Sequence, residues 1–184
     1  MIIAQITDLH VRAVGKTCNG FIETNRMLEE AVGAIARLDP RPDVVIPTGD
    51  LTDCGLVAEY EALRGILARL PMPVYLIPGN HDRRENLRQV FADSDCLPED
   101  GPFLHYAVDR FPVRLIGMDS VIPGQGHGSI CAERRAWLEA RLAEAPGKPT
   151  ILFLHHPPFS TGLKSMDAIG CLDGAEMEPI VRRH

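Results

Sequence analysis

The chain has 184 residues, of which 45% are hydrophobic and 24% charged, which is typical of one globular domain with a substantial core. Lys and Arg number 19 against 25 Asp and Glu, so the formal net charge is −6. This acidic balance disfavours a broad surface for nucleic-acid polymers or anionic membranes. No apolar run in the sequence approaches the length of a membrane span.

The N-terminal residues and the cysteines indicate the cellular compartment of the protein. The first residues, Met1–Ile6, form an apolar run without a basic segment or a cleavage pattern, so we expect no secretory signal. The five cysteines are scattered without paired short spacing, which favours reduced thiols over a disulfide framework. We therefore expect a cytoplasmic protein.

Apolar strands and amphipathic helices alternate through the first half of the chain. The pattern predicts, in chain order, a strand over Ile2–Thr7, a helix over Thr24–Leu38, a strand over Val44–Ile46, a helix over Ala58–Leu70 and a strand over Val74–Ile77. Continuous apolar strands separated by helices predict a parallel sheet that is buried on both faces.

The pattern changes in the second half of the chain. Two neighbouring strands without a helix between them are predicted over Leu104–Val108 and Val113–Met118. A helix over Ala132–Ala145 with Ser129 as its N-cap, a strand over Thr150–Leu154, a polar stretch and a helical run over Glu176–Arg183 follow. The sequence therefore predicts a single domain over residues 1–184, of the α/β class.

Polar side chains follow four of these strands, at the point where each strand ends. The blocks are Asp8-Leu9-His10, Gly49-Asp50, Gly79-Asn80-His81-Asp82 and His155-His156. In an open α/β sheet the carboxyl ends of the strands are where ligands bind. Carboxylate, imidazole and amide ligands without thiolates suit metals used for hydrolysis rather than a structural zinc site. The pattern favours a metal-assisted phosphoester hydrolase.

Each block also has a simpler interpretation when it stands alone. Asp8 and Asp50 could be turn formers, and the four-residue block at Gly79 could be a tight loop. If the backbone stays extended after the first strand, Asp8 and His10 point to the same side and could share a metal. Adjacent histidines point in opposite directions on an extended chain, so we expect only one of His155 and His156 to be a ligand.

In order and spacing, these blocks resemble the calcineurin-like metallophosphoesterase superfamily, whose blocks run D-x-H, G-D, G-N-H-[DE], H and G-H-x-H. Within it the chain resembles the branch of cyclic-nucleotide and glycerophosphodiester phosphodiesterases. Gly20-Phe21-Ile22 and Asp53-Cys54-Gly55 are similar to its glycerophosphodiesterase-like members. The resemblance covers nearly the whole chain and implies a metallophosphoesterase-type α/β/β/α sandwich.

The resemblance also implies a dinuclear centre of divalent or trivalent ions (Fe, Zn, Mn or Co). Asp8 and His10 would bind the first metal, Asp50 would bridge, and Asn80 and His155 would bind the second. His81 would contact the phosphoryl oxygens or help the leaving alkoxide gain a proton, so His81, Asn80 and Asp50 are the expected catalytic residues. Asp82 and His156 would orient these groups from behind. A metal-bound hydroxide would attack a small glycerophosphodiester or 3′,5′-cyclic nucleotide.

The last family block, G-H-x-H, is absent, because only His184 follows His156. We therefore expect the N-terminal portion of a family domain, lacking the C-terminal part of the second sheet, with roughly three protein ligands for each metal. Such a chain would complete its site as a homo-oligomer or have reduced activity. The alternative is a degenerate or truncated metal-binding scaffold with little activity; a monoesterase or nuclease is a weaker alternative.

Overall fold

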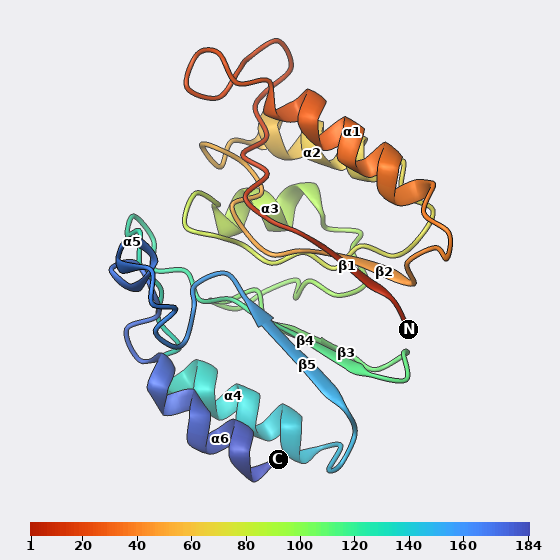
Figure 1. Ribbon diagram of the computed structural model, residues 1–184. Helices are drawn as coiled ribbons and strands as arrows, with labels where there is room; N and C mark the ends of the chain where they lie inside the picture. The colour runs from red at the N-terminus through yellow and green to blue at the C-terminus, as the bar shows by residue number, and fades with distance from the viewer.

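Two small sheets lie between two layers of helices (Figure 1). The computed structural model describes all 184 residues. In the first sheet, β1 (Ile3–Ile6) runs parallel to β2 (Val44–Pro47). The second sheet has the order β3–β4–β5, in which β3 (Tyr106–Val108) is antiparallel to β4 (Arg114–Met118) and β4 is parallel to β5 (Thr150–Leu154).

The helices cover the outer faces of the two sheets (Figure 1). Helices α1 (Thr24–Ala36) and α2 (Val57–Leu67) pack beside the first sheet, whereas α4 (Ala132–Ala143) and α6 (Glu178–Arg183) pack against the second. The expected α/β/β/α sandwich is therefore confirmed.

Strand β4 is buried on both faces and separates the two hydrophobic cores. Leu115 belongs to the large core of 25 buried residues between the sheets and under α1 and α2. Ile116 and Met118 point the other way, into the smaller core under α4 and α6. Gly117 faces the space between the sheets, where an added Cβ would lie 2.8 Å from Ile77. This alternation with a period of two is why the strand reads as a continuous apolar run.

The third predicted strand of the first sheet is only partly formed. Residues 74–77 lie beside β2 through two isolated parallel bridges, Val45 with Val74 and Thr48 with Ile77. Hydrogen bonds from Tyr75 N to Val45 O and from Ile77 N to Pro47 O flank a gap in the ladder. The gap falls at Pro47, because proline has no N–H to donate.

Most predicted helices are confirmed with shorter bounds, and some short ones were missed. The first two helices end at Ala36 and Leu67. Helices α3 (Arg84–Val90) and α5 (Lys164–Asp167) and the 3₁₀ turn η1 (Gly174–Met177) are too short to produce a helical pattern in the sequence. None of the helices is both long and apolar enough to cross a membrane.

The expected N-cap of α4 is wrong. The cap position belongs to Cys131, which makes no side-chain capping bond. Ser129 instead donates its hydroxyl to Asp173, 2.9 Å away, which joins the start of this helix to the C-terminal segment.

Burial of His105 should make the fold sensitive to acid. The ring lies 5.4 Å from the Phe103 ring and 4.3 Å from the Trp137 ring, centroid to centroid. Burial lowers the pKa of His105 to about 4, while the unfolded chain binds this proton below about 6.5. The unfolded state therefore takes up the proton first, and stability is lost as the pH falls from about 6.5 to about 4.

We predict that His105→Phe reduces this acid sensitivity. The difference in unfolding free energy between pH 7 and pH 4.5 should shrink by about 1–2 kcal/mol, a value discounted for the partial exposure of the ring. Urea unfolding at the two pH values measures it. Equal pH dependence in the two proteins would contradict the assignment.

Candidate metal centre

The polar blocks that follow the strands meet at one edge of the sandwich. The main-chain N–H of Asp8 donates to Gly49 O at 3.1 Å, and that of His10 donates to Asp50 O at 2.9 Å. The second sheet joins them through His155, whose Nδ1 lies 2.9 Å from the carbonyl oxygen of Thr48. The residues brought together, here named the Asp50 cluster, are Asp8, His10, Asp50, Asn80, His81 and His155.

Three residues of the Asp50 cluster adopt a left-handed backbone. The φ angles are +54° at Asp8, +42° at His10 and +47° at Asp50, a conformation that costs a non-glycine residue about 1–3 kcal/mol. The condition under which Asp8 and His10 would point to the same side, an extended backbone after the first strand, is therefore not met. As a result the two side chains belong to different groups: Asp8 lies with Asp50 and His155, and His10 lies with Asp53 and His81.

Two glycines allow the segments to approach this closely. A Cβ added to Gly49 would lie 2.4 Å from Nδ1 of His155. A Cβ added to Gly79 would lie 2.1 Å from the main-chain nitrogen of Asp50. Any side chain at either position would push the neighbouring segment out of place.

Asp50 is the centre of the cluster. It is 5% exposed, and three imidazoles surround its carboxylate. The Nε2 atoms of His10 and His81 lie 3.7 and 4.0 Å from Oδ2, and Nε2 of His155 lies 3.5 Å from Oδ1. The main-chain N–H of His81 also donates to Oδ1 at 3.0 Å. A carboxylate with both oxygens facing ligand atoms is suited to bridge two cations.

The histidine tautomers indicate that the cluster fits a metal. His155 Nδ1 faces a carbonyl oxygen, which can only accept, so Nδ1 is the donor, and whenever the ring is neutral its Nε2 holds a lone pair. That lone pair faces Asn80 Oδ1 at 3.2 Å and Asp50 Oδ1 at 3.5 Å. Acceptors that face one another are unfavourable unless a cation or a proton lies among them. Oxygen and imidazole donors suit divalent metal ions, and which residue binds which ion stays a prediction.

Asp82 holds two of the loops together from behind. Its buried carboxylate accepts five hydrogen bonds, from Leu51 N, Thr52 N, Thr52 Oγ1, Tyr60 OH and Gly79 N, at 2.8–3.2 Å. Burial raises the pKa of Asp82, and these donors oppose that shift. None of these five donors is a side chain of the Asp50 cluster, and the supporting role of Asp82 stays a prediction.

His156, which lies with His155 in a bend after β5 rather than on an extended chain, makes different contacts from His155. It is 2% exposed, its Nδ1 lies 2.7 Å from Ser120 Oγ, and burial lowers its pKa to about 4. The two rings meet edge to face at 4.9 Å. Only His155 faces Asp50.

Asp53 is a residue of the site that the sequence analysis missed. Its Oδ1 lies 3.4 Å from His10 Nδ1, and its Oδ2 lies 2.5 Å from Arg12 Nη1. Burial would raise its pKa, but hydrogen bonds from Cys18 and Arg12 leave the pKa of Asp53 below its usual range. The only indication in the sequence was that Asp53 lies three residues after Asp50. Hydrophobic periodicity cannot distinguish a site residue at this position from a turn residue.

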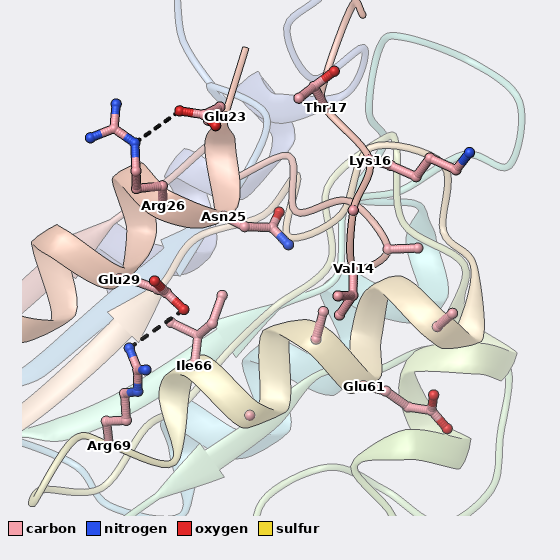
Figure 2. A pocket seen from close by; sticks show the side chains of 15 residues that line it. Val14, Lys16, Thr17, Glu23, Asn25, Arg26, Glu29, Glu61, Ile66 and Arg69 are labelled. Carbon is pink, nitrogen blue, oxygen red and sulfur yellow. Dashed lines mark hydrogen bonds and ion pairs between the residues drawn. The ribbon is translucent and has the colours of Figure 1, made fainter. Parts of the chain in front are cut away.

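A large hollow lies elsewhere, between residues 13–17 and helices α1 and α2 (Figure 2). It has a volume of about 1040 Å³, and none of the Asp50 cluster lines it. Its charged lining is balanced, with Arg26 2.9 Å from Glu23 and Arg69 3.6 Å from Glu29. The hollow therefore offers no excess of positive charge to a phosphate.

We predict that Asp82→Asn destabilises the fold by about 3 kcal/mol, because the amide NH₂ would face main-chain donors that are now bonded to a carboxylate. Chemical denaturation with and without added Mn²⁺ measures the change. Asp93→Asn is a matched control, since Asp93 pairs with Arg64 at an exposed position, and a loss no larger than the control's would contradict the supporting role.

Comparison with known proteins agrees with this geometry. The family described as "Calcineurin-like phosphoesterase" matches residues 1–182. The chain is 39% identical over 176 residues to the "Probable glycerophosphodiester phosphodiesterase GpdQ" of Arcobacter nitrofigilis, covering 96% of this chain and 64% of the relative. It is 37% identical over 187 residues to the "Glycerophosphodiester phosphodiesterase GpdQ" of Enterobacter lignolyticus, covering 100% and 66%.

A more distant relative and a solved structure extend the comparison. The "3′,5′-cyclic adenosine monophosphate phosphodiesterase CpdA" of Escherichia coli K12 is 27% identical over 181 residues, covering 98% of this chain and 64% of the relative. The purple acid phosphatase PPD1 of yellow lupin shares the fold, with a TM-score of 0.60 at 16% identity over 85% of this chain and 30% of that one. The chain thus spans about two thirds of the length of these bacterial relatives. It belongs to the calcineurin-like phosphoesterase family.

Proposed function

We propose that this chain is a metal-dependent phosphodiesterase for small diesters, either glycerophosphodiesters or 3′,5′-cyclic nucleotides. The observation that carries the proposal is the convergence of acceptor atoms around Asp50, where the lone pair of His155 faces Asn80 and a carboxylate. The relatives named for these two classes of substrate support the choice of diesters.

The metals would be held by the acidic, amide and imidazole side chains of the cluster, namely Asp8, His10, Asp50, Asn80 and His155. Bound there, two divalent ions would supply Lewis-acid stabilisation of the phosphate charge and would make a water molecule more acidic. Iron, zinc, manganese and cobalt all suit such ligands. Asn80 contributes an oxygen without a charge, so it would not repel the anionic diester.

We infer that His81 serves the leaving group. Its Nδ1 lies 2.8 Å from the carbonyl oxygen of Asp53, which leaves Nε2 as the atom available to hold a proton. Its side chain is 41% exposed, compared with 7% for Asp50, so it lies on the open side of the cluster. From there it would donate a proton to the departing alkoxide.

The remaining expectations about the protein stay predictions. They are that residues 1–184 form a portion of one metallophosphoesterase domain, that the chain assembles as a homo-oligomer and that it acts in the cytoplasm on small substrates. All five cysteines are free thiols in the structure.

We predict that the protein hydrolyses bis(p-nitrophenyl) phosphate with added Mn²⁺, and that Asp50→Asn lowers kcat by at least about 100-fold, because the substitution removes a charge shared by both ions. Asp93→Asn is the control. Initial rates with glycerophosphocholine, cyclic AMP and p-nitrophenyl phosphate distinguish diesters from monoesters. No turnover with any of the four metals would favour the scaffold over the enzyme.

A further inference from the structure

We propose that Asp53 is a positioning residue for the metal centre, which orients His10 through its carboxylate and His81 through its main-chain carbonyl. Both Nε2 atoms are thereby turned toward Asp50. The inference rests on the proposed metal centre and adds to it a residue outside the expected ligands, which acts through the two rings.

The carboxylate acts on His10. Asp53 Oδ1 lies 3.4 Å from Nδ1, while Nε2 on the opposite side of the ring lies 3.7 Å from Asp50 Oδ2. The Nδ1 contact is close but not aligned as a hydrogen bond, so its attraction is chiefly electrostatic. A negative charge beside Nδ1 keeps the proton of the neutral ring on that nitrogen and leaves the Nε2 lone pair for a cation.

The carbonyl acts on His81. The same residue places its main-chain oxygen 2.8 Å from His81 Nδ1, and Nε2 of that ring lies 4.0 Å from Asp50 Oδ2. The two imidazoles meet edge to face, with centroids 4.7 Å apart and an interplanar angle of 87°. One residue therefore sets the direction of two rings that converge on one carboxylate.

Arg12 holds Asp53 in place. Its Nη1 lies 2.5 Å from Asp53 Oδ2 and 3.3 Å from Oε1 of Glu59, which is fully buried in the first turn of α2. The main chain of Arg12 is held in turn by Asn25 of α1, which accepts from its N–H and donates to its carbonyl, both at 2.8 Å. The Asp53 and Arg12 side chains are only 20% and 21% exposed, so solvent and salt screen the pair less than a surface pair.

The test is a double-mutant cycle on metal affinity. Mn²⁺ binding to the metal-free protein is measured by calorimetry for the wild type, Asp53→Asn, His10→Ala and the double variant. Asp53→Asn keeps the size of the side chain and the main-chain carbonyl but removes the charge beside His10. We expect 10–100-fold weaker binding in Asp53→Asn, the range typical for loss of a group that orients a metal ligand.

The cycle isolates action through His10. In the His10→Ala background, adding Asp53→Asn should produce little further loss, because the ring that it orients is gone. Asp93→Asn, which also removes an arginine-paired carboxylate, should leave the affinity unchanged. The metal-free Asp53→Asn protein should still unfold cooperatively, at a temperature well above that of the binding assay, so that affinity is measured on folded protein. Should Asp53→Asn fail to fold, Arg12→Gln loosens the same carboxylate and should weaken binding by a smaller factor.

Several outcomes would overturn the inference. Wild-type affinity in Asp53→Asn, or losses that multiply fully in the double variant, would show that Asp53 does not act through His10. If Asp53→Asn does not fold and Arg12→Gln is measured in its place, unchanged Mn²⁺ affinity in Arg12→Gln would also overturn the inference. Unchanged affinity in His10→Ala alone would instead reject the proposed metal centre, so the two failures are distinguishable.

Discussion

The candidate site depends on one buried carboxylate, Asp82, whose hydrogen bonds all come from residues outside the Asp50 cluster. Asp82 accepts hydrogen bonds from Leu51, Thr52 and Gly79, and so ties the loop that carries Asp50 to the loop that carries Asn80 and His81. A charged acceptor shared by two loops strongly fixes their relative position. If either loop moves, its main-chain N–H groups lose their hydrogen bonds to the shared carboxylate. The hydroxyl of Tyr60 in α2 adds a fourth donor residue from the helical layer.

Given that constraint, the fold can hold groups that would otherwise repel one another. Three imidazoles surround a carboxylate that is nearly excluded from water, and the Asn80 amide oxygen faces one of them, His155. Left-handed backbone at Asp8, His10 and Asp50 adds local strain. The unfavourable free energy of the clustered polar groups and of the strained backbone is offset by packing of the two sheets, where β4 is buried on both faces. A preorganised site of this kind would bind cations without first rearranging.

The residues around the Asp50 cluster form two sets, one toward the substrate side and one toward helices α1 and α2. Those on the open side, such as His81, would meet the substrate. Those behind, such as Asp53 and Arg12, connect the cluster to α1 and α2 through Asn25 and Glu59. Asn25 also lines the large hollow, so hydrogen bonds through Arg12 and Asp53 connect the wall of the hollow to His81.

By itself the sequence determined the types of ligand, the strands that deliver them and the family, because ligands at strand ends are a local pattern with a regular order. It did not determine how Asp8 and His10 diverge, since a left-handed backbone there is imposed by pairing with residues 49–51. Nor did it find Asp53, which meets His10 only once the chain has folded. Contacts between residues 40 or more positions apart leave no trace in periodicity, so only the tertiary structure decided them.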